Sequence, residues 1–374
     1  MACVGGFGLV RQFPCAPAKQ LVLSSLRSSL RHCSSRTAHI LHAPPVAMER
    51  LEDCRNAVAQ DINRLHGSIR DEISSKLSNL SEVSQYYFDG NGKHLRPMIV
   101  FLMARACNQH SLGKSVLLDH QYTVGLVSEM IHTASLVHDD VIDNAECRRG
   151  KPAINKQWGE KMTILAGDYI LARCTLALAR TRHPEVVELL SRIIEDLVHG
   201  EFMQLGNREE NTDRFAHYLE KSFRKTASLL AHCCQAVALL STHAVEIQQA
   251  AYSFGRHTGL AFQIIDDVLD FISTTDTLGK PAANDLRQGL ATAPVLYAAE
   301  EYPELNDLII RRFSISGDVE RAQEYIAKSR GIERSRELAQ QHCEQALTAL
   351  RHLDASDERH VLQHITEDIL HRIK

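Results

Sequence analysis

Apolar residues recur every three or four positions along most of this chain from about residue 49 onward. This spacing predicts helices, and the alternating pattern of half-buried strands is scarce. The predicted helices cover residues 119–143, 161–180, 186–205, 214–240, 247–272 and 338–351. The pattern breaks at 89–97, 144–154, 206–213, 273–294 and 314–318. Because no change of composition divides this region, we expect residues 49–374 to form one large all-α domain.

One acidic pattern occurs twice inside these apolar helices, in LVHDDVID and in QIIDDVLD. Its carboxylates are Asp139, Asp140 and Asp143 in the first copy and Asp266, Asp267 and Asp270 in the second. On a helix they share one arc, where like charges four residues apart repel by about 0.2–0.5 kcal/mol per pair. A divalent cation reverses this cost, and Mg²⁺ prefers a few carboxylates together with phosphate oxygens. The repeat therefore predicts two Mg²⁺-binding helices that hold a diphosphate between them. We expect Asp140→Ala or Asp267→Ala to abolish turnover without disturbing the fold.

Basic residues accompany the two acidic motifs. A glycine-containing loop, Gly90–Pro97, runs into a predicted helix and offers backbone amides and cations, the usual means of holding a phosphate. The candidate cations are Lys93, Arg96, Arg148, Arg149, Lys225 and Lys280. Together with the carboxylates they indicate a site for two diphosphates, one bound through metal and one through cations alone.

The first 48 residues contain no Asp or Glu and are rich in Arg and Ser. This composition is typical of a mitochondrial transit peptide, although a disordered tail is the alternative. The net charge of −4 gives no indication of nucleic acid as a partner, and the 10 cysteines lack metal-binding spacing. We therefore expect reduced thiols and a matrix protein, soluble or peripheral to the inner membrane.

One stretch, residues 226–245, has no Asp, Glu, Lys or Arg and could be read as a membrane span. Its polar residues include two histidines, a glutamine, a serine and a threonine, so it falls short of the roughly 20 predominantly apolar residues that a span needs. We interpret it as a helix of the protein core.

Several segments resemble, in chain order, the conserved regions of the trans-isoprenyl diphosphate synthases. They are GKHLRP, HTASLVHDDVIDNAECRRGKP, LAGDYIL, GEFMQL, KTASL and FQIIDDVLDF, and the resemblance covers residues 80–298. The C-terminal FSISGDVERAQEYI and LAQQHCEQAL resemble the long-chain branch that makes the ubiquinone side chain in animal mitochondria. The resemblance implies a helical bundle with a central active-site cavity and a decaprenyl or solanesyl diphosphate synthase.

The resemblance also implies roles for single residues. Both aspartate motifs would bind Mg²⁺ ions that bridge the allylic diphosphate. Isopentenyl diphosphate would contact Lys93, Arg96, His132 and Arg149. The allylic diphosphate, from a farnesyl or geranylgeranyl primer, would contact Arg148, Lys225, Thr226, Gln263 and Lys280. A homologous second subunit is implied as partner. Three positions depart from the family pattern: Asn91 separates two glycines that are often adjacent, His94 replaces a common arginine, and Leu290 replaces a common lysine.

The residues that precede the first motif by four, five and eight positions share one helix face below the metal site. These are Ser135, Ala134 and Ile131, with Ser128 about one turn deeper. Because the upper two are small, we predict a long open tunnel and a long-chain product, although close helix packing also explains small residues. A shorter-chain synthase, a terpene cyclase and a non-catalytic subunit are the alternative functions.

Overall fold

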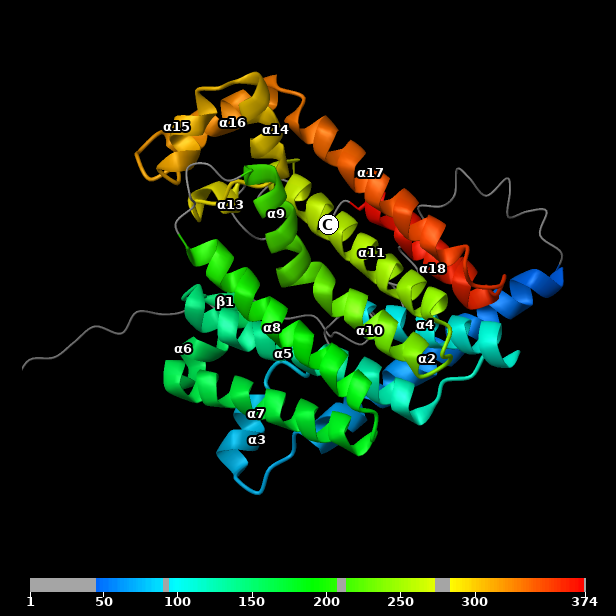
Figure 1. The fold of residues 1–374 in the computed structure, drawn as a ribbon. Coiled ribbons are helices and arrows are strands. Elements are labelled where there is room, and N and C mark those ends of the chain that lie inside the picture. The colour runs from blue at the N-terminus through cyan, green and yellow to red at the C-terminus, as the bar shows by residue number, and fades with distance from the viewer. Residues whose placement is uncertain (1–44, 90–93, 207–212, 273–282, 373–374) are drawn as a thin grey trace, which may run out of the picture. The chain divides into compact units, whose positions relative to one another are not determined.

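The computed structural model describes residues 45–89, 94–206, 213–272 and 283–372 (Figure 1). The chain divides into two compact units, Met1–Pro45 and Val46–Lys374. Residues 1–44 of the expected leader lie outside the described residues. Its expected boundary, after residue 48, falls in the first turn of α2, which begins at Pro45.

The described part of the second unit is built from helices, which confirms the all-α prediction. Its first helices are α2 (Pro45–Glu72), α3 (Ser78–Gln85), α4 (Leu95–Leu112), α5 (Asp119–Ile142), α6 (Ile154–Trp158), α7 (Glu160–Arg180) and α8 (Pro184–Leu205). They are followed by α9 (Arg214–Ser222), the π-helical turn η3 (Phe223–Ala227), α10 (Ser228–Leu239), α11 (Val245–Ile272) and α13 (Asn284–Arg287). The last are α14 (Ala293–Glu301), α15 (Leu305–Ile310), α16 (Asp318–Lys328), α17 (Gly331–Leu350) and α18 (Asp357–Leu370).

The apolar spacing located the long helices well and the interruptions less well. The stretch predicted at 214–240 is α9 and α10 joined by η3, because one wider π-helical turn interrupts the regular repeat. The break predicted at 144–154 contains two short antiparallel strands, β1 (Cys147–Arg148) and β2 (Lys151–Pro152), with Cys147 opposite Pro152.

Local sequence sets several helix ends. Pro184 occupies the first turn of α8, where its missing N–H costs nothing. Asp213 caps α9 by accepting hydrogen bonds from the backbone N–H groups of Phe215 and Ala216. At the end of α4, Gly113 adopts the left-handed φ of 66° that a glycine cap allows.

Helix α11 packs closely against α10 and η3 and also runs beside α17 (Figure 1). Two glycines one turn apart make the first contact possible. A Cβ atom on Gly255 would lie 2.5 Å from the carbonyl oxygen of Leu230, and one on Gly259 would lie 2.5 Å from Cα of Ala227. This close approach brings η3, the turn that carries Lys225 and Thr226, against the helix that carries the second acidic motif.

The apolar stretch at 226–245 forms α10, whose side chains are mostly buried, so the prediction of a core helix is confirmed. Another helix, α7, is long and apolar enough to cross a membrane by length and composition, and 39% of its most apolar window is buried. Core helices of soluble proteins pass the same test, so α7 alone is weak evidence for a span.

Candidate active site

The first acidic triplet lies at the C-terminal end of α5 and divides into two kinds of carboxylate. Asp140 is fully buried, and it accepts hydrogen bonds from the hydroxyl of Tyr87 and from Nε of Arg148. Asp139 and Asp143, one turn apart, retain exposed surface. The triplet therefore offers one carboxylate to the protein interior and two to the space outside the helix.

The second triplet, in the last turns of α11, repeats this division. Asp267 is 4% exposed and accepts hydrogen bonds from the hydroxyl of Tyr218 at 2.6 Å and from Nε2 of Gln263 at 2.7 Å. Asp270 is half-buried, and its Oδ2 accepts a hydrogen bond from the backbone N–H of Asp285 at 3.0 Å. In both motifs the middle aspartate is therefore buried against a tyrosine hydroxyl.

Asp266, the first carboxylate of the second motif, pairs with a residue close to the C-terminus. Nη1 of Arg372 lies 2.7 Å from Oδ1 of Asp266, and its guanidinium stands 4.0 Å above the ring of Phe262. Sequence reasoning did not single out Arg372, because it belongs to no motif and reaches the site only through the packing of α18.

The turn η3 is tied to the second motif and to α8 by its side chains. Oγ1 of Thr226 donates a hydrogen bond to Oε1 of Gln263 at 2.6 Å, and Gln263 in turn bonds the buried aspartate of the second motif. The neighbouring Lys225 forms an ion pair with Glu201 and donates a hydrogen bond to Gln204 at 3.1 Å. Residues predicted to contact the allylic diphosphate thus lie together between the acidic helices. A π-helical turn at such a place is a frequent feature of functional sites.

Burial makes three of these carboxylates, Asp139, Asp143 and Asp267, costly to ionise. Burial raises the pKa of Asp139 to about 6, and the charges of Glu201 and Asp143 add to this effect while Lys225 opposes it. Burial also raises the pKa of Asp143, and it raises the pKa of Asp267 to about 7. Both motifs lie near helix C-termini, where the helix dipole disfavours negative charge. A bound cation would relieve this cost.

The donor set fits a hard divalent cation bound in an open manner. Among the described residues, no three His, Cys, Asp or Glu side chains are placed to hold a metal ion. Each motif instead presents two outer carboxylates four residues apart, Asp139 with Asp143 and Asp266 with Asp270. A cation such as Mg²⁺, which completes its shell with water and phosphate oxygens, suits this arrangement better than one that needs a closed cage.

The buried middle aspartates require a correction. We expected Asp140 and Asp267 to leave the fold unaffected when replaced, and this expectation is wrong, because each is buried and hydrogen-bonded to two side chains. A role for them as direct metal ligands stays a prediction, and it is less favoured by this geometry than the role of the outer carboxylates.

A second, cationic cluster lies at the start of α4 and beside β1. Nη1 of Arg96 donates a hydrogen bond to Nε2 of His132 at 3.1 Å, and Arg149 donates one to the carbonyl of Tyr87 at 3.4 Å. Burial, and then the charges of Arg96 and Arg149, hold the pKa of His132 well below its usual range. The neutral ring therefore accepts from Arg96, and the two guanidinium groups together could hold an anion. Lys93 and Lys280, predicted to belong to the diphosphate sites, lie outside the described residues.

The structure also corrects the open tunnel that we expected below the first motif. Ser128, Ile131 and Ala134 are at most 1% exposed, so neighbouring side chains fill the space beside them. Ser135, half-buried, turns its hydroxyl back to the carbonyl of His132 at 2.9 Å. Close helix packing, the alternative explanation for these small residues, is what the structure contains. A growing hydrocarbon along this face must displace side chains.

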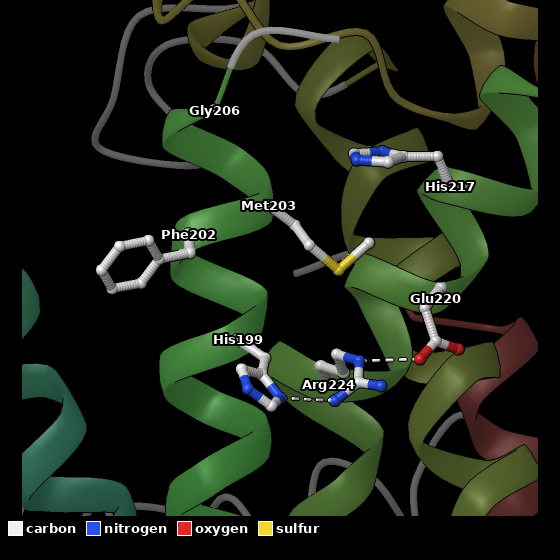
Figure 2. A pocket seen from close by; sticks show the side chains of 7 residues that line it. All are labelled: His199, Phe202, Met203, Gly206, His217, Glu220 and Arg224. Atoms are coloured by element: carbon white, nitrogen blue, oxygen red, sulfur yellow. Dashed lines mark hydrogen bonds and ion pairs between the residues drawn. The ribbon is translucent and has the colours of Figure 1, made fainter. Parts of the chain in front are cut away.

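A hollow that sequence reasoning missed lies between α8 and α9 (Figure 2). It has a volume of about 480 Å³ and is lined by His199, Phe202, Met203, Gly206, His217, Glu220 and Arg224. Arg224 donates to Nδ1 of His199 at 3.0 Å and to Glu220 at 2.7 Å, and Figure 2 shows Met203 pointing between the helices while Phe202 projects from the other side of α8. No aspartate of either motif lines this hollow, so we do not assign it to the reaction.

Residues 77–326 match the family described as polyprenyl synthetase. An all trans-polyprenyl-diphosphate synthase of Homo sapiens is 50% identical over 315 residues, which cover 84% of this chain and 76% of that protein. The decaprenyl-diphosphate synthase subunit 1 of Schizosaccharomyces pombe is 40% identical over 348 residues, covering 86% of this chain and 92% of the relative. The mitochondrial solanesyl-diphosphate synthase 1 of Oryza sativa is 39% identical, with coverages of 87% and 80%.

Solved structures agree with these sequence matches. A polyprenyl synthase from Caulobacter crescentus, complexed with calcium and isoprenyl diphosphate, has a TM-score of 0.76 and 32% identity, covering 87% of this chain and 98% of that one. A decaprenyl diphosphate synthase from Rhodobacter capsulatus has a TM-score of 0.77 and 28% identity, with coverages of 87% and 99%. The resemblance read from the sequence is confirmed, and it favours a synthase over a terpene cyclase.

Proposed function

Because the chain belongs to the polyprenyl synthetase family and is a prenyltransferase, we propose that it makes a long all-trans-polyprenyl diphosphate. It adds isopentenyl diphosphate units to an allylic primer, farnesyl or geranylgeranyl diphosphate. The product is decaprenyl or solanesyl diphosphate, in keeping with the relatives of those names. Its role is to supply the ubiquinone side chain in mitochondria.

The observation that carries this proposal is the pairing of two unlike anion sites. One consists of the outer carboxylates on α5 and α11, with Lys225 near enough to Asp139 and Asp143 to affect their pKa, which suits a diphosphate bound through cations. The other, around Arg96 and Arg149, has guanidinium groups and a neutral histidine, which suits a diphosphate bound directly. A synthase needs both, because one diphosphate departs and the other stays attached.

The two diphosphate sites divide the steps of chain elongation between them. The C–O bond of the allylic diphosphate breaks, and Lys225 lies where negative charge grows on the departing pyrophosphate. Arg96 and Arg149 hold isopentenyl diphosphate so that its double bond attacks the allylic carbon and forms the new C–C bond. The resulting cation loses a proton to the departed pyrophosphate, which restores a double bond. The apolar interior of the helices excludes water that would trap the cation.

Magnesium ions held by Asp139 and Asp143 on one side and by Asp266 and Asp270 on the other would neutralise the allylic diphosphate and stabilise the departing pyrophosphate. Asp140 and Asp267 act indirectly, by holding side chains that contact the allylic diphosphate. Asp140 fixes Arg148, while Asp267 fixes Gln263 and through it Thr226. Two predicted contacts to the allylic diphosphate, Arg148 and Gln263, are thereby held in place by buried carboxylates.

A homologous second subunit binds the exposed apolar faces of α7 and α8. Side chains at helical spacing remain uncovered there, among them Leu165 at 57% exposure and Phe202 at 72%. The others are Met162, Leu176, Val198 and Leu205. Exposed apolar surface of this kind marks an interaction site. The assembled enzyme is located in the mitochondrial matrix, soluble or peripheral to the inner membrane.

The decisive experiment incubates the purified chain, alone and co-expressed with its homologous partner, with radiolabelled isopentenyl diphosphate, farnesyl diphosphate and Mg²⁺. Chromatography of the dephosphorylated products should show chains of nine or ten units, with a large gain in the presence of the partner. Phe202→Glu should weaken co-purification of the partner, whereas Val116→Glu, at another exposed apolar position, serves as control. Absence of prenyl products in both samples would reject the enzyme assignment, and full activity of the isolated chain would reject only the second subunit.

A further inference from the structure

Two histidines that are distant in the sequence, one on α2 and one just before α4, are in contact beside the cationic cluster. Nε2 of His66, on α2, lies 2.9 Å from Nε2 of His94, the residue that precedes α4. Their rings meet edge to face, with centroids 4.6 Å apart. His94 has a left-handed backbone with φ 46° and ψ 32°, which a residue other than glycine holds only when its surroundings fix it. Because His94 is two residues from Arg96, whatever fixes His94 also fixes the start of the anion site.

A buried carboxylate determines which ring nitrogens of the two histidines carry a proton. Nδ1 of His94 lies 3.4 Å from Oε1 of Glu129, which is 5% exposed, and it makes no well-aligned hydrogen bond with any other described residue. Burial alone would raise the pKa of Glu129, but His94, Arg96 and Arg149 bring it below its usual range. The ionised carboxylate therefore favours a proton on Nδ1 of His94. Nε2 of the same ring is then the acceptor, and Nε2–H of His66 is the donor.

We infer that His66 is a positioning residue for the isopentenyl diphosphate site, acting through its hydrogen bond to His94. This inference rests on the proposed function. His66 does not touch the substrate; it ties α2 to the strained residue at the start of α4. The tie keeps Arg96 at the distance from His132 that the anion site requires. Loss of the donor lets the start of α4 relax, which weakens the binding of isopentenyl diphosphate but leaves the carboxylates of the allylic site on α5 and α11 unchanged.

The same contact is sensitive to pH, because two protonated imidazoles would point N–H groups at each other. Burial, and then the neighbouring His94, lower the pKa of His66. The other charged groups that face it are Glu129 from α5, Arg70 from α2 and Asp89. His66 is thus neutral at pH 7 and the bond is intact. Acidification that protonates both rings would remove the acceptor and break the bond.

The experiment compares His66→Leu, which removes the donor, with His66→Gln, whose amide N–H can replace it. His360→Leu is the matched control, because His360 and His364 form the same Nε2–Nε2 contact at 2.9 Å within α18, away from the anion site. Steady-state kinetics give KM for each substrate and kcat, and calorimetry gives Kd for isopentenyl diphosphate alone. His66→Leu should raise KM and Kd for isopentenyl diphosphate about three- to tenfold, the value of one hydrogen bond. Its kcat and its KM for the allylic substrate should stay within about twofold, and both His66→Gln and the control should match the unaltered chain.

The pH profile gives a second, independent readout. On acidification, KM for isopentenyl diphosphate, corrected for the ionisation of the diphosphate itself, should rise more in the unaltered chain than in His66→Gln, whose amide does not titrate. Unchanged KM and Kd in His66→Leu, or equal pH profiles in the unaltered chain and His66→Gln, would overturn the inference. If His66→Leu does not fold, the pH profiles of the unaltered chain and of His66→Gln decide the question alone. If no sample makes prenyl product, the proposed function fails, while the calorimetric Kd still judges the role of His66.

Discussion

Replacing Asp139 by asparagine should make the metal-free protein more stable and the enzyme nearly inactive. Asp139 is a half-buried carboxylate on α5 whose pKa is raised to about 6, first by burial and then by the charges of Glu201 and Asp143. An acid with a raised pKa in the folded state opposes folding when it is ionised. Asparagine has nearly the same shape and no charge, so it removes this cost together with the predicted metal ligand.

The magnitude follows from the shift in pKa. Going from 3.8 to about 6 is about two units, or about 3 kcal/mol at pH 7 and above. The penalty is absent below about pH 4, where the carboxyl is protonated in both states, and it develops between about pH 4 and 7. For a unit of about 330 residues the unfolding entropy is about 0.7 kcal/mol per degree, so Tm should rise by about 4 °C at pH 7.5.

Thermal unfolding of the metal-free protein at pH 7.5 and at pH 4 measures the effect, with Asp119→Asn, an exposed position on the same helix, as control. Product formation by Asp139→Asn should fall about 100- to 1,000-fold, as when a group that stabilises a leaving charge is removed. Added Mg²⁺ and diphosphate should raise Tm less in this variant than in the unaltered chain. Lower stability at pH 7.5, or near-normal turnover, would refute the reasoning.

Three further outcomes are expected. Asp140→Ala should lower the free energy of unfolding by about 3–5 kcal/mol in denaturant titrations, because Arg148 loses its ion-pair partner. Asp267→Ala should lower it by about 1–3 kcal/mol, because Tyr218 and Gln263 lose an acceptor; unchanged stability would contradict both expectations. A hydrocarbon that grows along this face displaces the side chains beside Ala134, so Ala134→Tyr should shorten the product to a few isoprene units; full-length product on chromatography would exclude growth along this face. Because Ala134 is fully buried, the larger side chain should also cost about 1–3 kcal/mol of stability. A fluorescent fusion of residues 1–48 should enter mitochondria, and a cytosolic signal would speak against a transit peptide.

The helices could be predicted because their apolar positions keep one period over long stretches, as in α5 and α11. The interruptions of helices and the tertiary contacts could not be predicted from the sequence. A single extra residue in η3 widens one turn, and this changes the direction of Lys225 and Thr226 without leaving a break in the apolar pattern of 214–240. Arg372 follows no motif, and it reaches Asp266 only because α18 ends beside the second acidic helix.

The different roles of the aspartates within each acidic triplet also depend on tertiary contacts that the sequence spacing does not predict. Sequence spacing places adjacent aspartates about a quarter-turn apart on a helix, but it does not say which of them faces the interior. That choice is made by Tyr87, in the turn after α3, and by Tyr218, on α9, which donate to Asp140 and Asp267. The two tyrosine hydroxyls lower the free-energy cost of burying each carboxylate, because a buried acceptor without a donor is destabilising. Each motif thereby has a fixed inner acid whose hydrogen bonds tie its helix to a neighbouring segment, and we propose that the outer pair faces the substrate.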